Sequence, residues 1–236
     1  MHIEANEIHI FTANLETSPF QENTDLLSKD ECERANCFQF PIHRQRFIAA
    51  RSLLRAIVSL YIDVAPSKII FSYDTHKKPF LENVPLAFNL SHSDHMAVYA
   101  LTMHHAIGVD IEKIQPDYHE AVAERFFGLA EKNALLALPL PERPRLFYRI
   151  WARKEAIVKA LGKGISHSLS SFSVSANDDF ENIMIDNDAW LLLPISVDQA
   201  WQAAAATNQP VRKITYWKFE NQYPVLEKEE IVENKP

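Results

Sequence analysis

The chain has 236 residues, of which 47% are hydrophobic and 23% are charged, the balance expected of a globular protein with a substantial core. Its formal net charge of −7 argues against a nucleic-acid-binding protein, because such proteins normally present a basic face. No apolar run approaches the ~20 residues of a membrane span, and the first residues lack the pattern of a signal peptide. We therefore expect a cytoplasmic protein without a membrane partner. Its only cysteines, Cys32 and Cys37, are too few for a disulfide framework or a cysteine-rich zinc site.

The first half of the chain predicts two helices followed by short strands. Ser28 and Glu31 have the spacing of a capping box and predict a helix over 28–38. Apolar residues at helical spacing predict a longer helix over 42–62. β-rich runs between polar turns then predict strands over 69–73, 86–90, 96–103 and 107–111.

The second half repeats the order of helices followed by strands. Helical patterns cover 117–127, 130–138 and 145–161, and strand patterns cover 171–175, 189–195 and 213–220. This order predicts an α/β (α+β) fold of two similar halves, each a long helix packed on a small sheet. We expect an N-terminal half over 1–106, a C-terminal half over 107–226 and a charged, frayed tail over 227–236.

A short internal echo bears on the relation between the halves. Ala56-Ile57-Val58 recurs as Ala156-Ile157-Val158. Matches of this length also arise by chance, so duplication and coincidence both stay open. Under duplication, the halves would be related by a pseudo-twofold axis with the active site between them.

Two segments carry the clearest chemical signal. In Gly108-Val-Asp-Ile-Glu112, Asp110 and Glu112 lie two residues apart on a predicted strand and therefore share one face. In the helix over 145–161, Glu155 and Lys159 lie four residues apart and also share a face. Taken separately, the first pair could be a solvent-facing stripe and the second a surface ion pair. If the two segments meet, three carboxylates and a lysine suit a divalent cation that holds a diphosphate.

Other segments are rich in groups that could bind an anion. Asn89-Leu-Ser-His-Ser93 offers Ser91 and His92 to a phosphate, although ordinary turn chemistry explains the same residues. Arg51 stands in a basic run on the long helix, and Lys77-Lys78 form a basic pair in a short loop. These groups suit a small anion, or they form a solvated surface. The histidines lack the spacing of common zinc motifs.

Together these segments resemble the 4′-phosphopantetheinyl transferases of the larger, surfactin-synthetase-activating type, from about residue 28 to about residue 175. The resemblance rests on these motifs of the sequence: Ala50-Arg51-Ser-Leu-Leu-Arg55, Lys78-Pro79, Phe88-Asn-Leu-Ser-His-Ser93, Gly108-Val-Asp-Ile-Glu112, Arg125-Phe-Phe127, and Trp151-x-x-Lys-Glu-Ala-x-x-Lys159 followed by Gly162-Lys-Gly164.

The resemblance implies a reaction. Members of this family move the phosphopantetheine arm of coenzyme A to a serine of an acyl- or peptidyl-carrier protein, release adenosine 3′,5′-bisphosphate and use Mg²⁺. It implies a metal site of Asp110, Glu112 and Glu155, with Lys159 on the diphosphate and Glu131 at the position of a general base. Asn89, Ser91 and His92 would contact coenzyme A phosphates, and Arg51, Lys77 and Lys78 would bind its nucleotide end.

Two departures and two rival functions accompany this resemblance. Lys77 stands where many relatives carry a glycine, and Glu31 and Glu33 leave only Arg34 as a basic residue in a helix where relatives often carry several. A non-catalytic module that binds coenzyme A or a carrier protein is one rival, and a Mg²⁺-dependent diphosphate hydrolase is the other. We expect a monomer, because a pseudo-dimer would complete the site within one chain.

Overall fold

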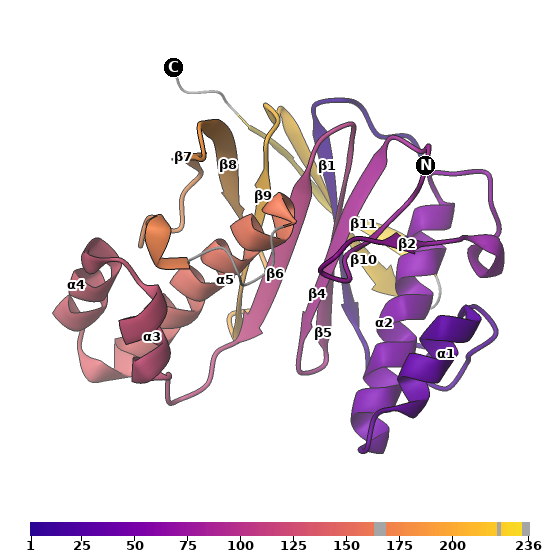
Figure 1. Ribbon diagram of the computed structural model, residues 1–236, viewed down its shortest axis with the longest axis horizontal. Coiled ribbons are helices and arrows are strands. Elements are labelled where there is room, and N and C mark those ends of the chain that lie inside the picture. The colour runs from indigo at the N-terminus through magenta and orange to yellow at the C-terminus, as the bar shows by residue number, and fades with distance from the viewer. Residues whose placement is uncertain (163–168, 221–222, 233–236) are drawn as a thin grey trace. The chain divides into compact units, whose positions relative to one another are not determined.

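The computed structural model describes residues 1–162, 169–220 and 223–232 (Figure 1). The chain forms two compact units. The first comprises Met1–Tyr73, Pro79–His104 and Val211–Pro236, and the second comprises Asp74–Lys78 and His105–Pro210. Each unit contains a β-sheet and one long helix, which confirms the α/β class. Within the described part of the chain, no helix is both long enough and apolar enough to cross a membrane.

The first unit is built on a five-stranded sheet of order β11-β10-β1-β5-β4. Strand β1 pairs in parallel with β10 on one side and antiparallel with β5 on the other. Most of β1 and β5 is buried, as expected for central strands. The strands are β1 (Glu7–Asn14), β4 (Leu86–Ser93), β5 (Met96–Met103), β10 (Lys213–Glu220) and β11 (Tyr223–Ile231).

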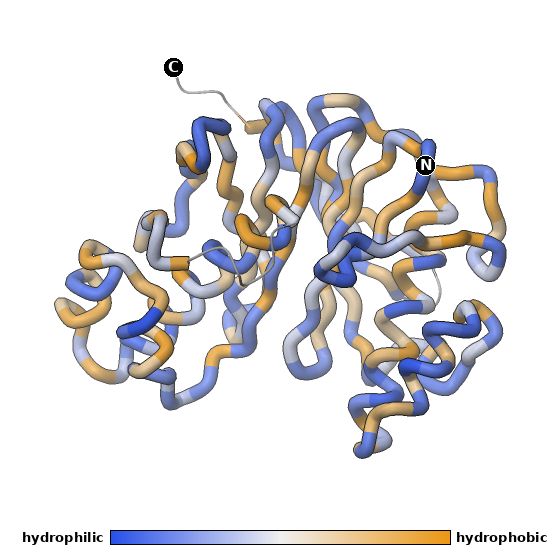
Figure 2. Tube along the Cα trace, viewed as in Figure 1, coloured by the Kyte–Doolittle hydropathy of each residue, from blue (hydrophilic) through white to orange (hydrophobic). Residues whose placement is uncertain are grey.

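Helix α2 (Pro41–Ser59) supplies the helical part of the first core. Its start carries a proline, which suits the first helical turn because the missing N–H would have no partner there. Hydrophobic and hydrophilic residues alternate along it with the helical turn (Figure 2). Leu53, Leu54 and Ile57 are at most 1% exposed. The smaller elements are α1 (Lys29–Asn36), η1 (Pro66–Lys68), β2 (Ser72–Tyr73) and β3 (Pro79–Phe80).

The second unit is built on a four-stranded antiparallel sheet of order β6-β9-β8-β7. Helix α5 (Arg143–Leu161) contacts β6, β9 and β8 of this sheet. Gly162 ends α5 in the left-handed region at φ 67°, a conformation that costs glycine little. The remaining elements are β6 (Ile107–Lys113), α3 (Glu120–Phe126), α4 (Leu129–Ala137), η2 (Leu140–Glu142), η4 (Leu169–Ser171), β7 (Glu181–Ile185), β8 (Asp188–Pro194) and β9 (Trp201–Thr207).

The structure differs from the expected boundaries at the C-terminal end. Residues 213–220, expected in the second half, form β10 beside β1 in the sheet of the first unit. Residues 227–231, expected to fray, belong to β11, which pairs with β10. The open edge of β1 needs a partner for its backbone N–H and C=O groups, and such a pairing between distant segments has no local sequence signal.

Two other expectations about strands need correction. No strand forms over 171–175, because side chains bind this backbone: Glu131 accepts from the N–H of Val174, and Lys154 donates to the C=O of Phe172. Strand β9 is absent from the expectations because its alanines are depleted in strands generally. Pairing with β6 and β8 on both sides overrides that preference.

Candidate metal and diphosphate site

Strand β6 places Asp110 and Glu112 on one face, as its alternation predicts. Ile107, Val109 and Ile111 occupy the other face and are at most 1% exposed. Asp110 is also buried, at 4% exposed, whereas Glu112 is partly exposed. A buried carboxylate on a sheet is costly unless a cation or hydrogen-bond donors face it, so the element that covers this face decides its chemistry.

Helix α5 is that element, and Gly108 allows its close approach. A Cβ atom on Gly108 would lie 2.1 Å from the carbonyl oxygen of Ala156 and 2.3 Å from the backbone N of Ala160. Backbone atoms cannot move aside as a flexible side chain can. Gly108 is therefore required for the distance at which β6 and α5 meet.

This close approach brings together the two segments that the sequence singled out. Lys159 Nζ donates to Asp110 Oδ1 at 2.6 Å. Burial raises the pKa of Glu155; the Asp110 carboxylate adds to this shift and Lys159 opposes it. Asp110, Glu155 and Lys159 thus form one electrostatic group across the contact between β6 and α5.

Glu112 faces the same helix farther along the strand. Burial raises the pKa of Tyr148, two helical turns before Glu155, and the charge of Glu112 adds to this shift. Alternation along β6 places Glu112 on the same side of the strand as Asp110.

The residues present fit a hard divalent cation. Glu155 Oε1 is buried and has no hydrogen-bond partner among the residues that the structure describes. An unpartnered buried carboxylate oxygen beside a second carboxylate is unfavourable, and a cation would offset both the burial and the repulsion. The three carboxylates offer oxygen ligands only, the set that Mg²⁺ prefers.

Glu131, which the resemblance places as general base, is instead engaged within the second unit. It is 2% exposed. Its Oε2 accepts from the N–H of Gly128 at 2.6 Å and its Oε1 from the N–H of Val174 at 2.7 Å. Lys154 Nζ lies 3.0 Å from Oε1. A carboxylate held in this way is not positioned to receive a proton from a second protein.

Lys78 also has internal partners. Its Nζ donates to the carbonyl oxygens of Ile107 at 2.9 Å and Lys159 at 2.6 Å, where β6 begins and α5 ends. Burial lowers the pKa of Lys78 to about 8, with Asp74 opposing this shift and Lys159 adding to it. Lys78 therefore fastens the Asp74–Lys78 turn to the helix that carries Glu155. Its neighbour Lys77 is exposed, with φ at 67°.

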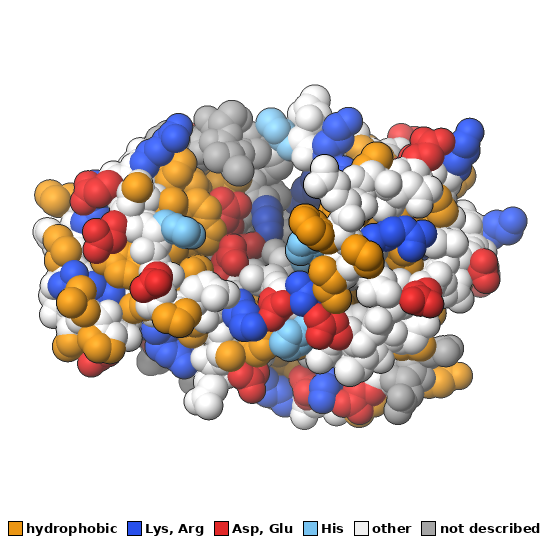
Figure 3. All heavy atoms as spheres, turned by 90° about the horizontal axis from the view of Figure 1, so that it is seen from below, with side chains coloured by type: hydrophobic (Ala, Val, Ile, Leu, Met, Phe, Trp, Pro, Cys, Tyr) orange, Lys and Arg blue, Asp and Glu red, His pale blue; other side chains and the backbone are white. Residues whose placement is uncertain are grey.

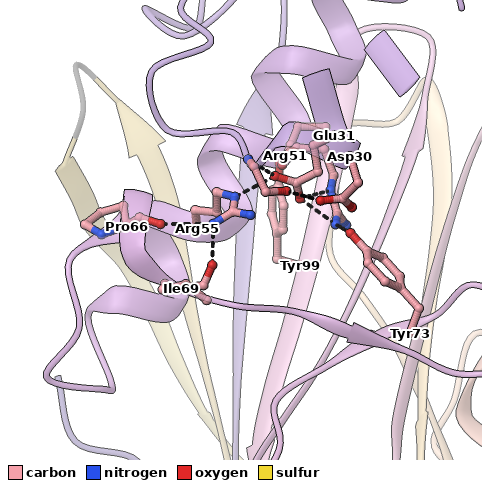
Figure 4. A network of polar contacts seen from close by, with 10 residues as sticks. Asp30, Glu31, Arg51, Arg55, Pro66, Ile69, Tyr73 and Tyr99 are labelled. Carbon is pink, nitrogen blue, oxygen red and sulfur yellow. Dashed lines mark hydrogen bonds and ion pairs between the residues drawn. The ribbon is translucent and has the colours of Figure 1, made fainter. Parts of the chain in front are cut away.

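Arg51, expected on the nucleotide, is held in the network that Figure 4 shows. It donates to Glu31 Oε1 at 2.8 Å and to the hydroxyl of Tyr73 at 2.7 Å. Glu31 also accepts from Arg55 Nε at 2.7 Å, and Asp30 lies beside the same tyrosine. Arg51 is 8% exposed and Arg55 1%. The carboxylates balance this arginine pair, so it is not an open anion site.

Asn89, Ser91 and His92 all lie on the edge strand β4. Asn89 and Ser91 share a face and are at most 9% exposed, whereas His92 projects from the opposite face and is exposed. The structure therefore does not place Ser91 and His92 side by side. Across the face drawn in Figure 3, the coloured Lys and Arg side chains are interspersed with Asp and Glu.

Sequence reasoning missed the structural roles of three residues, Gly108 and Lys154 in the second unit and Glu31 in the first. Local sequence does not predict that Gly108 sets the distance between β6 and α5, or that Lys154 and Glu31 pair with buried charges. Lys154 is 0% exposed and lies directly before Glu155. A lysine inside the apolar pattern of a helix could have signalled a buried counter-charge, but the identity of that partner required the fold.

Comparison with known proteins identifies the family. Residues 15–104 match the N-terminal region of 4′-phosphopantetheinyl transferase, and residues 106–211 match the 4′-phosphopantetheinyl transferase superfamily. The chain is 36% identical over 209 residues to 4′-phosphopantetheinyl transferase HetI of Nostoc sp., covering 86% of this chain and 88% of that protein. It is 35% identical over 180 residues to psf-1 of Bacillus pumilus, covering 75% and 76%. It is 35% identical over 154 residues to Sfp of Bacillus subtilis, covering 65% and 68%. The chain belongs to the 4′-phosphopantetheinyl transferase superfamily, among its Sfp-like enzymes.

Proposed function

We propose that this enzyme transfers the 4′-phosphopantetheine group from coenzyme A to a serine of an acyl- or peptidyl-carrier protein, in a reaction that depends on Mg²⁺. The observation that carries the proposal is the convergence of Asp110, Glu155 and Lys159 where β6 meets α5. A divalent cation held by these carboxylates would act together with Lys159 to offset negative charge on a diphosphate.

Each of these residues has a role in the proposed reaction. Asp110, Glu112 and Glu155 would hold Mg²⁺. When bound, this ion would neutralise negative charge on the diphosphate. Lys159 would bind an oxygen of the diphosphate. Its present partner is Asp110 Oδ1, so this ammonium group is already oriented toward the carboxylates. A preoriented cation stabilises developing negative charge without reorganisation at the moment of reaction.

The proposed transfer forms one bond to phosphorus and breaks another. The hydroxyl oxygen of the carrier serine forms a bond to the β-phosphorus of coenzyme A. The bond from that phosphorus to the bridging oxygen breaks, and adenosine 3′,5′-bisphosphate leaves with the electron pair. The proton of the serine hydroxyl passes to Glu155, whose buried Oε1 has no hydrogen-bond partner among the described residues. A carboxylate has two oxygens, so one can hold the cation while the other accepts the proton.

We retain Lys77 as a proposed ligand for the nucleotide end of coenzyme A, and Asn89, Ser91 and His92 as proposed ligands for its phosphates. Lys77 is exposed, so a phosphate can reach it. Arg51 and Lys78 are proposed as structural supports instead, because their donors are used by Glu31, Tyr73 and backbone carbonyls.

Intact-mass spectrometry of apo carrier proteins tests the function. We expect a gain of one phosphopantetheine group after incubation with the enzyme, coenzyme A and Mg²⁺, and its loss with EDTA. Free phosphopantetheine with an unmodified carrier would favour the hydrolase. Coenzyme A binding without modification of any carrier on a broad panel would favour the non-catalytic module.

A further inference from the structure

Lys154 is a fully buried lysine in the middle of α5, one residue before Glu155. Its Nζ donates to the carbonyl oxygens of Leu169 at 2.7 Å and Phe172 at 2.6 Å. The same atom lies 3.0 Å from Glu131 Oε1 and 4.6 Å from the centre of the Phe172 ring. With 0% exposure, this ammonium group has exchanged all contact with solvent for these partners.

Glu131 completes the arrangement from α4. It provides the negative charge that a buried ammonium group needs, and its two oxygens also accept the backbone N–H groups of Gly128 and Val174. The pair therefore connects three segments: the start of α4, the stretch from Leu169 to Val174, and the middle of α5. Such a pair is costly to bury, and removing one member leaves the other charge without compensation.

We infer that Lys154 and Glu131 form a buried ion pair that positions Glu155, so that Glu131 is a positioning residue rather than the general base. This inference rests on the proposed function, because it assigns a role within the same reaction. Neighbouring residues on a helix point in directions about 100° apart. Lys154 is bound on the side of α4 and Leu169–Val174, while Glu155 interacts with Asp110 of β6.

The geometry explains how the pair acts on Glu155. Gly108 sets the distance of α5 from β6, but a helix on a strand can still rotate about its own axis. The contacts of Lys154 oppose this rotation from the other side of α5. Loss of the pair should therefore lower kcat through misplacement of Glu155, and leave the KM for coenzyme A within about threefold of wild type.

The test compares Glu131→Gln, Lys154→Met and the double variant in the carrier-modification assay. A positioning pair predicts that each single change lowers kcat about tenfold or more, because one buried charge loses its partner. The double variant, which buries no charge, should be at least about fivefold more active than Glu131→Gln. The pH dependence of kcat/KM should keep its wild-type shape in every active variant.

A general base predicts the opposite order. The double variant lacks the carboxylate, so its activity would equal or fall below that of Glu131→Gln, and either result overturns the inference. The matched control is the exposed pair Glu124 and Lys132, which lie 2.9 Å apart in the same unit. The double change Glu124→Gln with Lys132→Met should leave kcat and KM at wild-type values.

A measurement on the wild-type protein covers the case in which the variants do not fold. The backbone N–H groups of Gly128 and Val174 should exchange with solvent slowly, at rates similar to those of the most protected amides of α5. Fast exchange of both would overturn the inference. Transfer by the wild-type enzyme tests the proposed function separately, because that activity does not depend on which residue is the base.

Discussion

Lys159 Nζ lies 2.6 Å from Asp110 Oδ1, so the ammonium group of helix α5 is paired with the carboxylate of strand β6. This contact joins residues 49 positions apart in the sequence. It shows that the two segments with chemical signals in the sequence meet within one unit of the fold. Glu155, a second carboxylate of this site, contributes to the same electrostatic group and retains an oxygen without a hydrogen-bond partner among the described residues.

Asp110→Asn should lower the Mg²⁺-dependent rate of carrier modification about 10²-fold or more, because the amide cannot neutralise a cation. The variant should remain folded, since asparagine is nearly isosteric with aspartate. Steady-state kinetics with varied Mg²⁺ measure the effect. Asp117→Asn, a change at an exposed position of the same unit, should retain wild-type kinetics. Full activity of Asp110→Asn would remove this residue from the metal site.

Gly108→Ala should destabilise the protein by about 1–3 kcal/mol, because β6 and α5 must separate to admit the new methyl group. The separation should also lower the rate of carrier modification more than the loss of folded protein explains. Urea unfolding and kinetics on the same samples measure both effects. Gly162→Ala is the comparison: its Cβ has space, at 3.6 Å from Asp74 Oδ2, but φ of 67° costs about 1 kcal/mol. Equal stability of Gly108→Ala and wild type would contradict the close approach.

Glu31→Gln should destabilise the first unit by about 3–5 kcal/mol, since Arg51 and Arg55 would keep their buried charges but lose the carboxylate that both of them contact. Denaturant unfolding, followed by circular dichroism, measures the difference. Glu33→Gln provides the control, because Glu33 forms an exposed ion pair with Lys29, and the expected change is within about 0.5 kcal/mol. A change of similar size in both variants would show that the buried network contributes little.

The stability of the protein should fall as the pH is lowered from about 6.5 to about 4, and His9 should be one cause. Burial lowers the pKa of His9 to about 4; Glu7 opposes this shift and Lys213 adds to it. The ring also contacts the hydroxyl of Tyr61, and Glu229 lies near enough to act on it. Between these pH values the unfolded chain binds a proton that the folded protein does not. The free energy of unfolding should therefore decrease by up to about 1.4 kcal/mol per pH unit.

Urea unfolding at a series of pH values checks this dependence. His9→Gln should reduce the slope over the acidic range, although the variant is less stable at pH 7 because it loses buried contacts. His43→Gln, at an exposed position, should keep the wild-type slope. If the slopes of all three proteins coincide, protonation of His9 does not cause the loss of stability at acidic pH.

Local periodicity accounts for what could be predicted about the site. Alternation along a strand places Asp110 and Glu112 on one face, and helical spacing places Glu155 beside Lys159; both hold in the structure. The long helices α2 and α5 follow from the same kind of pattern, because their apolar residues recur with the helical turn. These features depend only on residues within a few positions of each other.

The tertiary structure decided which charges are available and which are already paired. Arg51 looked like an anion ligand until α1 placed Glu31 against it, and Glu131 looked like a base until α5 placed Lys154 against it. Likewise, β10 lies beside β1 rather than within the second half. Each of these outcomes joins residues far apart in the chain. Their physical reason is the same: a buried charge or an open strand edge must find a partner, and only the fold determines which partner is within reach.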